Sequence, residues 1–370
     1  MGGIGWQAIH YVVGLSRLGH DVYYVEDSAA QPYDPRVRSL VDNCSYSVEF
    51  LRRTMERFGL GDRWVYRDGV NDRCYGLSRE RLEELYREAD TLVNLCGATW
   101  LREEHLRCPI RIYVQTDPVY DQILVAQNNQ DRLITLSRHT HHFTYGENLG
   151  QPNCPIPMEM FQWRATRPPV VLNLWEPRFD SLAEAFTTVG TWKNSGKDVH
   201  FAGKTYCWSK HVNFLRFLDL PRLTSQPLEL ALESIDPTAR RLLRRKGWRV
   251  TGAFEKSRDT TAYQEHIYRS RGEFTVAKDL VASTHSGWFS DRSVCYLAAG
   301  KPVVTQETGF SKFVPTGRGL FAFSTCEEAA AAIEEINRDY PDHCRAAREI
   351  AAGYFSSDHV LAELCRDVGL

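Results

Sequence analysis

The sequence has no long apolar run and no excess of charge of either sign. No uncharged stretch of about 18 residues occurs, and no apolar signal-type segment opens the chain, so we expect no integral membrane segment, no export and a cytoplasmic location. The 45 basic and 47 acidic residues give a formal net charge of −2, which disfavours nucleic acid and anionic membranes as partners. We therefore expect a small-molecule partner.

Cysteine pairs and metal-ligand spacings are also missing. The ten cysteines occur singly, with neither a Cys-x-x-Cys motif nor a compact disulfide pattern, which indicates a reduced interior. His139, His141 and His142 are close in sequence, but their offsets do not place all three on one helix face. No Asp or Glu completes a set at helical spacing. We predict no metal site.

What the sequence does contain is an alternation of strand and helix patterns, which predicts a parallel α/β architecture. At 370 residues the chain is longer than one hydrophobic core usually supports, so two domains are expected. In the first half, buried-strand patterns at 91–95, 111–114 and 133–135 alternate with helical patterns at 36–58, 78–88, 119–127 and 138–145. In the second half, strand patterns lie at 186–189, 228–232, 248–250, 274–277, 302–305 and 320–323, and helical patterns at 325–337, 342–353 and 358–366.

Five prolines within a short stretch, at 152, 155, 157, 168 and 169, indicate a stiff crossover between the domains. We predict an N-terminal domain at 1–155, a linker at 156–178, a C-terminal domain at 179–345 and terminal helices at 346–370. The first helical pattern follows Gly2 and Gly3 at once and ends at Gly19, before a β-rich run. A doubly wound domain needs a strand before such a glycine segment, so its first strand is apparently missing. We expect about ten upstream residues to supply it.

The C-terminal half carries the most specific pattern. Ser286-Gly287-Trp288-Phe289-Ser290-Asp291-Arg292-Ser293 is a polar loop that runs into a short helix. It is followed by a Gly300-Lys301-Pro302 turn, a buried strand and a second glycine-bearing loop, Glu307-Thr308-Gly309-Phe310-Ser311. Two such loops after neighbouring strands form a site for a nucleotide and its phosphates.

This segment resembles the donor half-site of GT-B glycosyltransferases. The resemblance implies two doubly wound, Rossmann-like parallel-sheet domains that face a cleft, with the last helix returning to the first domain. It also implies metal-independent transfer of a sugar from a nucleotide-sugar co-substrate, without another cofactor, to a small-molecule or glycan acceptor. Many retaining members carry two glutamates eight residues apart, but Gly287 and Cys295 occupy those positions here. The donor base, the sugar, the acceptor, the stereochemical outcome and the oligomeric state stay open.

Residues of the donor site are predicted from these loops and from the loop after the first strand of the second domain. A helix N-terminus and an arginine both suit phosphate. Ser290 or Asp291 could instead cap the helix, Arg292 could face a carboxylate, and Trp192 could belong to the core. Lys204 and Lys210 are alternatives to Lys193 as the lysine that meets the diphosphate. The predicted donor-binding residues are Gly190, Trp192, Lys193, Ser286, Gly287, Asp291, Arg292, Ser293, Thr308, Gly309, Phe310 and Ser311.

The acceptor side is predicted from the first domain. Asp117 follows an apolar strand, where a carboxylate points into the ligand crevice and can accept a proton from an acceptor hydroxyl. It could also cap the next helix. Gly2 and Gly3, which permit close backbone approach, and His139 are predicted to contact the acceptor. A nucleotide-sugar epimerase, a non-catalytic GT-B partner subunit and a ligand-binding protein are the alternative functions.

Overall fold

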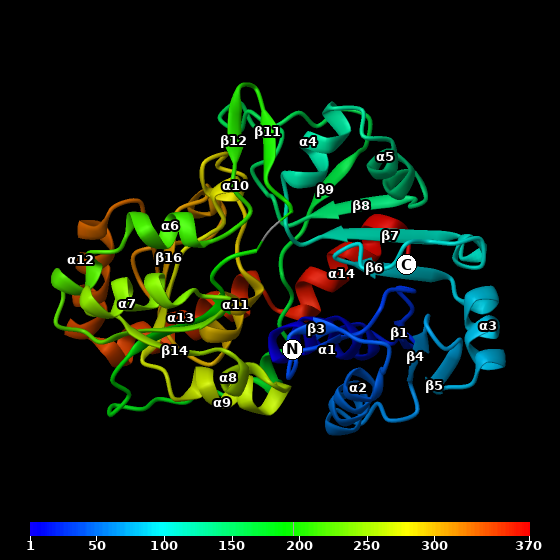
Figure 1. Ribbon diagram of the computed structural model, residues 1–370, viewed down its shortest axis with the longest axis horizontal. Coiled ribbons are helices and arrows are strands. Elements are labelled where there is room, and N and C mark those ends of the chain that lie inside the picture. Colours follow the sequence, from blue (N-terminus) through cyan, green and yellow to red (C-terminus); the bar gives the residue numbers. More distant parts are fainter. Residues whose placement is uncertain (195) are drawn as a thin grey trace.

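The computed structural model describes residues 1–194 and 196–370, which form two α/β lobes side by side (Figure 1). The N-terminal lobe opens with a helix and ends with the strand β9. Its elements are α1 (Gly2–Arg17), β1 (Tyr24–Glu26), β2 (Tyr33–Asp34), β3 (Ser39–Leu40), α2 (Ser45–Arg57), β4 (Trp64–Asp68), β5 (Arg73–Gly76), α3 (Arg79–Glu88), β6 (Thr91–Leu95), η1 (His105–Arg107), β7 (Ile110–Gln115), α4 (Tyr120–Ala126), α5 (Gln130–Ser137), β8 (His141–Thr144) and β9 (Trp163–Ala165).

The C-terminal lobe is built on a six-stranded parallel sheet with the order β14-β13-β10-β15-β16-β17. Numbered along the chain, that order is 3-2-1-4-5-6, as in doubly wound nucleotide-binding sheets. The elements of this half are η2 (Leu172–Leu174), β10 (Phe186–Thr191), β11 (Val199–Phe201), β12 (Lys204–Tyr206), α6 (His211–Arg216), η3 (Leu220–Arg222), β13 (Leu228–Glu233), α7 (Pro237–Arg245), β14 (Arg249–Gly252), α8 (Phe254–Ser257), α9 (Thr260–Tyr268), β15 (Gly272–Thr275), α10 (Asp279–Ala282), α11 (Asp291–Ala298), β16 (Val303–Gln306), η4 (Phe310–Lys312), β17 (Leu320–Phe323), α12 (Cys326–Arg338), α13 (Tyr340–Tyr354) and α14 (Ser357–Val368).

The N-terminal lobe has its main sheet in two parts. The strands β1, β4 and β5 form one part, and the parallel strands β6, β7, β8 and β9 form the other. Val25 of β1 and Leu92 of β6 pack against one apolar cluster, made of Val65, Leu82 and Tyr86, so the two parts adjoin. Within the described residues, β1 and β6 each pair with a strand on one side only.

Most predicted elements have a counterpart, but two predictions in the N-terminal lobe are wrong. The strand predicted at 133–135 lies inside α5, and the helix predicted at 138–145 is replaced by the strand β8. The short run Leu133-Ile134-Thr135 fits a helix as well as a strand, so periodicity could not decide between them. The helix predicted at 36–58 begins only at α2, and the segment 156–178 contributes the strand β9 to the N-terminal sheet.

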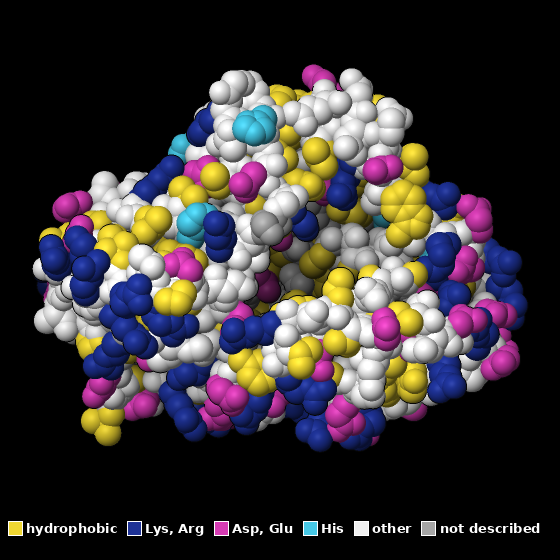
Figure 2. All heavy atoms as spheres, in the orientation of Figure 1, with side chains coloured by type: hydrophobic (Ala, Val, Ile, Leu, Met, Phe, Trp, Pro, Cys, Tyr) yellow, Lys and Arg dark blue, Asp and Glu magenta, His cyan; other side chains and the backbone are white. Residues whose placement is uncertain are grey.

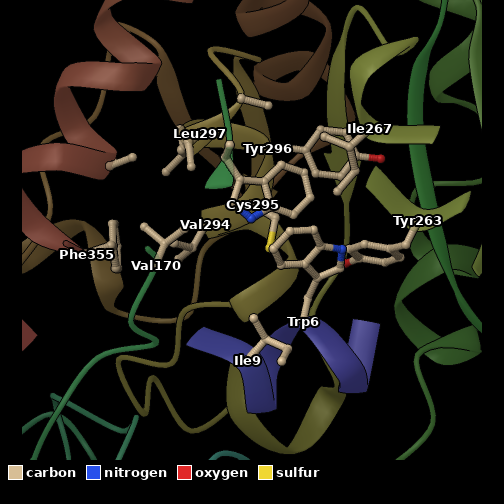
Figure 3. Close-up of a cluster of buried hydrophobic side chains, with 14 of the residues drawn as sticks. Trp6, Ile9, Val170, Tyr263, Ile267, Val294, Cys295, Tyr296, Leu297 and Phe355 are labelled. Carbon is tan, nitrogen blue, oxygen red and sulfur yellow. The ribbon is translucent and has the colours of Figure 1, made fainter. Parts of the chain in front are cut away.

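The first helix joins the two lobes. α1 packs against α9 and α14, and the indole Nε1 of Trp6 donates to the carbonyl of Thr260 at 2.8 Å. In Figure 3, Trp6 lies beside Cys295 of α11 and Tyr263 of α9, inside a buried cluster that also holds Ile9. The packing of α1 on three helices of the C-terminal half fixes the lobes around a shared core. None of the helices in residues 1–194 and 196–370 combines the length and apolar character needed to cross a membrane.

Candidate active site

The C-terminal sheet reverses its winding between β10 and β15, the position where doubly wound sheets bind ligands. These two strands pair in parallel, so both end at the same edge of the sheet. Just beyond β15, Lys278 contacts Asp117 of the N-terminal lobe. Figure 2 shows a hollow at the centre of this face, between the lobes and near α11 in the view of Figure 1. Charged side chains from both lobes gather at these strand ends.

Arg292 is fixed at this point of reversal by three hydrogen bonds. Its Nη1 donates to the carbonyl of Val189 at 3.0 Å, its Nη2 to Oγ1 of Thr275 at 2.7 Å, and its Nε to Oε1 of Glu273 at 2.5 Å. The side chain of Arg292 is 12% exposed and that of Glu273 is 0% exposed. A guanidinium has five N–H donors, so these bonds leave two for a phosphate. Arg292 was predicted either to bind a phosphate or to face a carboxylate. The carboxylate contact is present, and it leaves N–H donors free for a phosphate.

Asp117 of the N-terminal lobe forms an ion pair with Lys278 of the C-terminal lobe. Lys278 Nζ lies 2.6 Å from Asp117 Oδ1 and 3.5 Å from the ring centroid of Trp208. Asp117 follows β7 and its side chain is 37% exposed, whereas the side chain of Lys278, after β15, is 14% exposed. The candidate base therefore lies at the junction of the two lobes, beside the end of β15.

The alternative role of Asp117 as a helix cap is not realised. The N-cap residue of α4 is Val119, whose amide donates to Oε1 of Gln122 at 2.9 Å. Asp117 instead makes its short contact with Lys278. Its position is consistent with contact to a ligand in the hollow.

Lys210 completes a cationic cluster with Lys278 and Arg292. Burial, together with the positive charges of Arg292 and Lys278, lowers the pKa of Lys210 to about 7. Its Nζ lies 5.7 Å from the ring centroid of Trp288. Because a neighbouring anion favours the charged form of a lysine, phosphate binding would raise this pKa again. Lys204, the other alternative, is exposed, with its Nζ 4.8 Å from the ring centroid of Tyr206.

The two glycine-bearing loops lie against each other. The amide of Gly287 donates to the carbonyl of Thr308 at 2.7 Å, and Oγ1 of Thr308 donates to the carbonyl of Trp288 at 2.5 Å. The amide of Gly309 donates to the carboxylate of Glu307. The amide of Gly287 therefore joins the two loops, whereas that of Gly309 is used inside its own loop. Phosphate contact at this site has to come from other donors.

The first of these loops also contacts the N-terminal lobe. Gly287 has φ +82°, and a Cβ on it would collide with the backbone nitrogen of Asn148. The amide of Asn148 donates to the carbonyl of Ser286 at 3.0 Å, and Nε1 of Trp288 donates to the carbonyl of Thr116 at 2.8 Å. Ser286 itself is fully buried. The loop 286–288 is therefore a contact between the lobes.

Asp291 begins α11 but faces the N-terminal lobe. Burial raises the pKa of its carboxyl group. Ser290, the N-cap residue, makes no side-chain hydrogen bond to the helix, and the buried Oγ of Ser293 has no partner among the described residues. Asp291 lines a small pocket of about 10 Å³, enough for one water molecule. The other residues that line this pocket are Gln7, His10, Tyr145, Pro168, Pro169 and Cys295.

Two predicted donor residues belong to the core. Trp192 is 2% exposed and stacks on Phe214 at a centroid distance of 5.8 Å. Phe310 is fully buried, 5.0 Å from the ring of Phe289. For Trp192, the alternative of a core position is the one present, because the packed indole has no free face for a donor.

Three further residues, Gly190, Lys193 and Ser311, were predicted to bind the sugar donor. A Cβ on Gly190, at the end of β10, would lie 3.9 Å from Nη1 of Arg292, so this glycine adjoins the cationic cluster. Lys193 and Ser311 are both exposed. Their contact with a donor stays a prediction.

The predicted acceptor residues lie in packed surroundings. A helix occupies the place expected for a glycine loop, and the missing Cβ atoms of Gly2 and Gly3 face Tyr263 of α9. His139 is 5% exposed. Its Nε2 is 3.0 Å from Nδ2 of Asn94 and its Nδ1 is 2.9 Å from the carbonyl of Thr135. Burial lowers the pKa of His139 to about 4, as expected for a neutral structural histidine.

Sequence reasoning missed Glu273 and Lys278. Lys278 follows β15, so the rule that identified Asp117 after β7 could have found it. Glu273 gave no such signal, because its partner is defined only once α11 packs on the sheet. Among residues 1–194 and 196–370, no group of three His, Cys, Asp or Glu side chains is placed to hold a metal ion.

Comparison with known proteins gives the fold. No family model matches this chain, and no curated protein matches its sequence. An alpha-glucosyltransferase in complex with UDP and a 13-mer DNA containing a HMU base matches with a TM-score of 0.61 at 11% identity, over 100% of this chain and 96% of that one. AviGT4, a glycosyltransferase involved in avilamycin A biosynthesis, gives 0.54 at 13% identity, over 100% and 90%. Sucrose-phosphate synthase from Thermosynechococcus elongatus gives 0.51 at 13% identity, over 79% and 80%. These likenesses confirm the predicted GT-B fold.

Proposed function

We propose that this protein is a glycosyltransferase that moves a sugar from a nucleotide donor, held by the C-terminal lobe, to a hydroxyl acceptor held by the N-terminal lobe. The observation that carries the proposal is the cationic cluster of Lys210, Lys278 and Arg292 at the point of reversal of a doubly wound sheet, opposite Asp117. Such clusters suit a diphosphate, whose charge grows as the bond to the sugar breaks.

Each charged group then has a role in an inverting reaction. The acceptor oxygen attacks the anomeric carbon of the sugar, Asp117 takes the hydroxyl proton, and the nucleoside diphosphate leaves with the bonding electron pair. The cationic cluster stabilises the leaving diphosphate. Lys278 pairs with Asp117 at 2.6 Å, and a diphosphate that competes for this lysine would free the carboxylate.

A nucleotide screen tests the donor site. We expect one of UDP, GDP, dTDP and ADP to raise the melting temperature selectively, because a ligand at 100 times its dissociation constant adds about 2.7 kcal/mol to the free energy of unfolding. A variant with exposed Arg245 of α7 replaced, Arg245→Met, serves as the control and should respond like the wild type. The absence of a response to all four nucleotides would contradict a nucleotide-sugar donor.

The pH dependence of donor binding should report Lys210. Its pKa of about 7 lies below the usual lysine value, so the lysine loses its charge as the pH rises through 7. We expect the affinity for the selected nucleotide-sugar to fall between pH 7 and 9, by at most about tenfold per pH unit. The other charged groups that face Lys210 are Arg292, Lys278, Glu273 and Asp117. Lys210→Arg keeps its charge and should give a flat profile in calorimetric titrations, whereas an unchanged slope would exclude Lys210 as the cause.

A further inference from the structure

Glu273 is an unusual residue for the interior of a parallel sheet. It lies in β15 between Thr187 of β10 and Val303 of β16, and its side chain is 0% exposed. Oε1 accepts from Nε of Arg292 at 2.5 Å, whereas Oε2 has no hydrogen-bond partner among the described residues. Burying a carboxylate with an unsatisfied oxygen costs stability. A half-satisfied buried charge therefore calls for an explanation other than stability.

The structure around Glu273 places its carboxylate against the guanidinium of Arg292. Side chains two residues apart in a strand share a face, so Glu273 and Thr275 both point to the side covered by α11. Both accept hydrogen bonds from Arg292, which also donates to the carbonyl of Val189. The carboxylate holds the Nε edge of the guanidinium, and the two remaining N–H donors belong to the Nη groups.

We propose that Glu273 is a positioning residue that both orients Arg292 and lowers the affinity of the cationic cluster for the diphosphate. This inference rests on the proposed function, because it takes the diphosphate as the ligand of Arg292. A negative charge in direct contact with the guanidinium offsets part of its attraction for an anion on the far side. Weaker attraction lets the nucleoside diphosphate leave after sugar transfer, a step that limits turnover in many enzymes.

Glu273→Gln tests this directly, since glutamine keeps an oxygen for Nε of Arg292 and removes the charge. We expect the nucleoside diphosphate selected in the screen to bind about tenfold more tightly to the variant, measured by titration calorimetry at low salt. The matching uncharged nucleoside should bind both proteins equally. With the nucleotide-sugar, the variant should show a lower KM for the donor together with a lower kcat.

Glu229→Gln is the matched control. Glu229 lies in β13 of the same sheet, separated from β15 by β10. It accepts from Oγ1 of Thr251 at 3.0 Å and pairs with Lys256 at 3.5 Å. It does not contact Arg292 in the described part of the chain. Its replacement should leave the dissociation constant of the diphosphate unchanged, which separates the effect of Glu273 from a general loss of acidic charge in the sheet.

The outcomes distinguish this inference from the proposed function. If the wild type binds none of the nucleotides, the donor site is wrong. If the wild type binds and Glu273→Gln binds equally or more weakly, the role given to Glu273 is overturned. A Glu273→Gln protein that folds only with the diphosphate present would support an electrostatic coupling between Glu273 and the diphosphate. The bound diphosphate then supplies the negative charge beside Arg292 that the variant lacks. A variant that stays unfolded at saturating diphosphate would make Glu273 purely structural and overturn the proposal.

Discussion

Replacing Arg292 by methionine is expected to lower the free energy of unfolding by about 3–5 kcal/mol and to abolish the response to nucleotides. The stability loss arises because the substitution leaves the carboxylate of Glu273, which is 0% exposed, without its counter-ion. The functional loss arises because the methionine has no N–H groups for a phosphate. Denaturant unfolding with and without the selected nucleoside diphosphate measures both effects.

The double variant Arg292→Met/Glu273→Leu separates the two effects. Removing both members of a buried ion pair is often neutral or stabilising, so we expect the double variant to unfold within about 1 kcal/mol of the wild type. It should still fail to respond to the nucleotide. A double variant that recovers nucleotide binding would show that Arg292 serves the fold alone.

Lys301→Met is expected to raise the free energy of unfolding by about 1–3 kcal/mol at pH 7, because a lone buried amine is costly. Lys301 follows α11 in the Gly-Lys-Pro turn and is fully buried, and its Nζ has no hydrogen-bond partner among residues 1–194 and 196–370. Burial lowers the pKa of Lys301. The unfolded chain, where a lysine has its ordinary pKa of about 10.4, therefore binds this proton more readily than the folded protein does.

The sign of the pH dependence follows from that difference. The unfolded state binds more protons between the lowered pKa and about 10.4, so wild-type stability rises with pH in this window. The advantage of Lys301→Met should therefore be largest near neutral pH and shrink toward pH 10. Chemical unfolding at several pH values checks this, with the exposed Lys204→Met as the control expected to show no such trend. A stability gain that is constant with pH would point to packing instead of charge.

The C-terminal lobe was the more predictable half. Its buried strands are short and mainly apolar, such as Leu228–Leu232, in which only Glu229 is charged, and the sequence alone locates them. The segment from Ser286 to Ser311 predicted the helix α11 and the strand β16. It also predicted that Arg292 lies near the strand ends, and Arg292 does donate to the carbonyl of Val189 in β10. Local patterns of this kind can be recognised in the sequence because each depends only on residues that are close along the chain.

The site was predictable only in part, since its contacts join distant segments. Glu273 and Arg292 are 19 residues apart, and Asp117 and Lys278 are 161 apart. No periodicity encodes how α11 packs on β15 or how the lobes dock. The same limit explains Trp192, because an aromatic residue after a strand can face either a ligand or the core, and the stacking on Phe214 decides for the core.

Turnover of the nucleotide-sugar tests the central claim most directly. The measurement is release of nucleoside diphosphate from the sugar conjugate of the selected nucleotide, with a panel of hydroxyl acceptors, by the wild type and by Asp117→Asn. We expect the wild type to release it in an acceptor-dependent way and Asp117→Asn to be slower by about 100-fold or more, as for loss of a general base. The exposed Asp131→Asn should match the wild type. A wild type that binds the nucleotide but transfers no sugar, or an Asp117→Asn protein of full activity, would contradict this account.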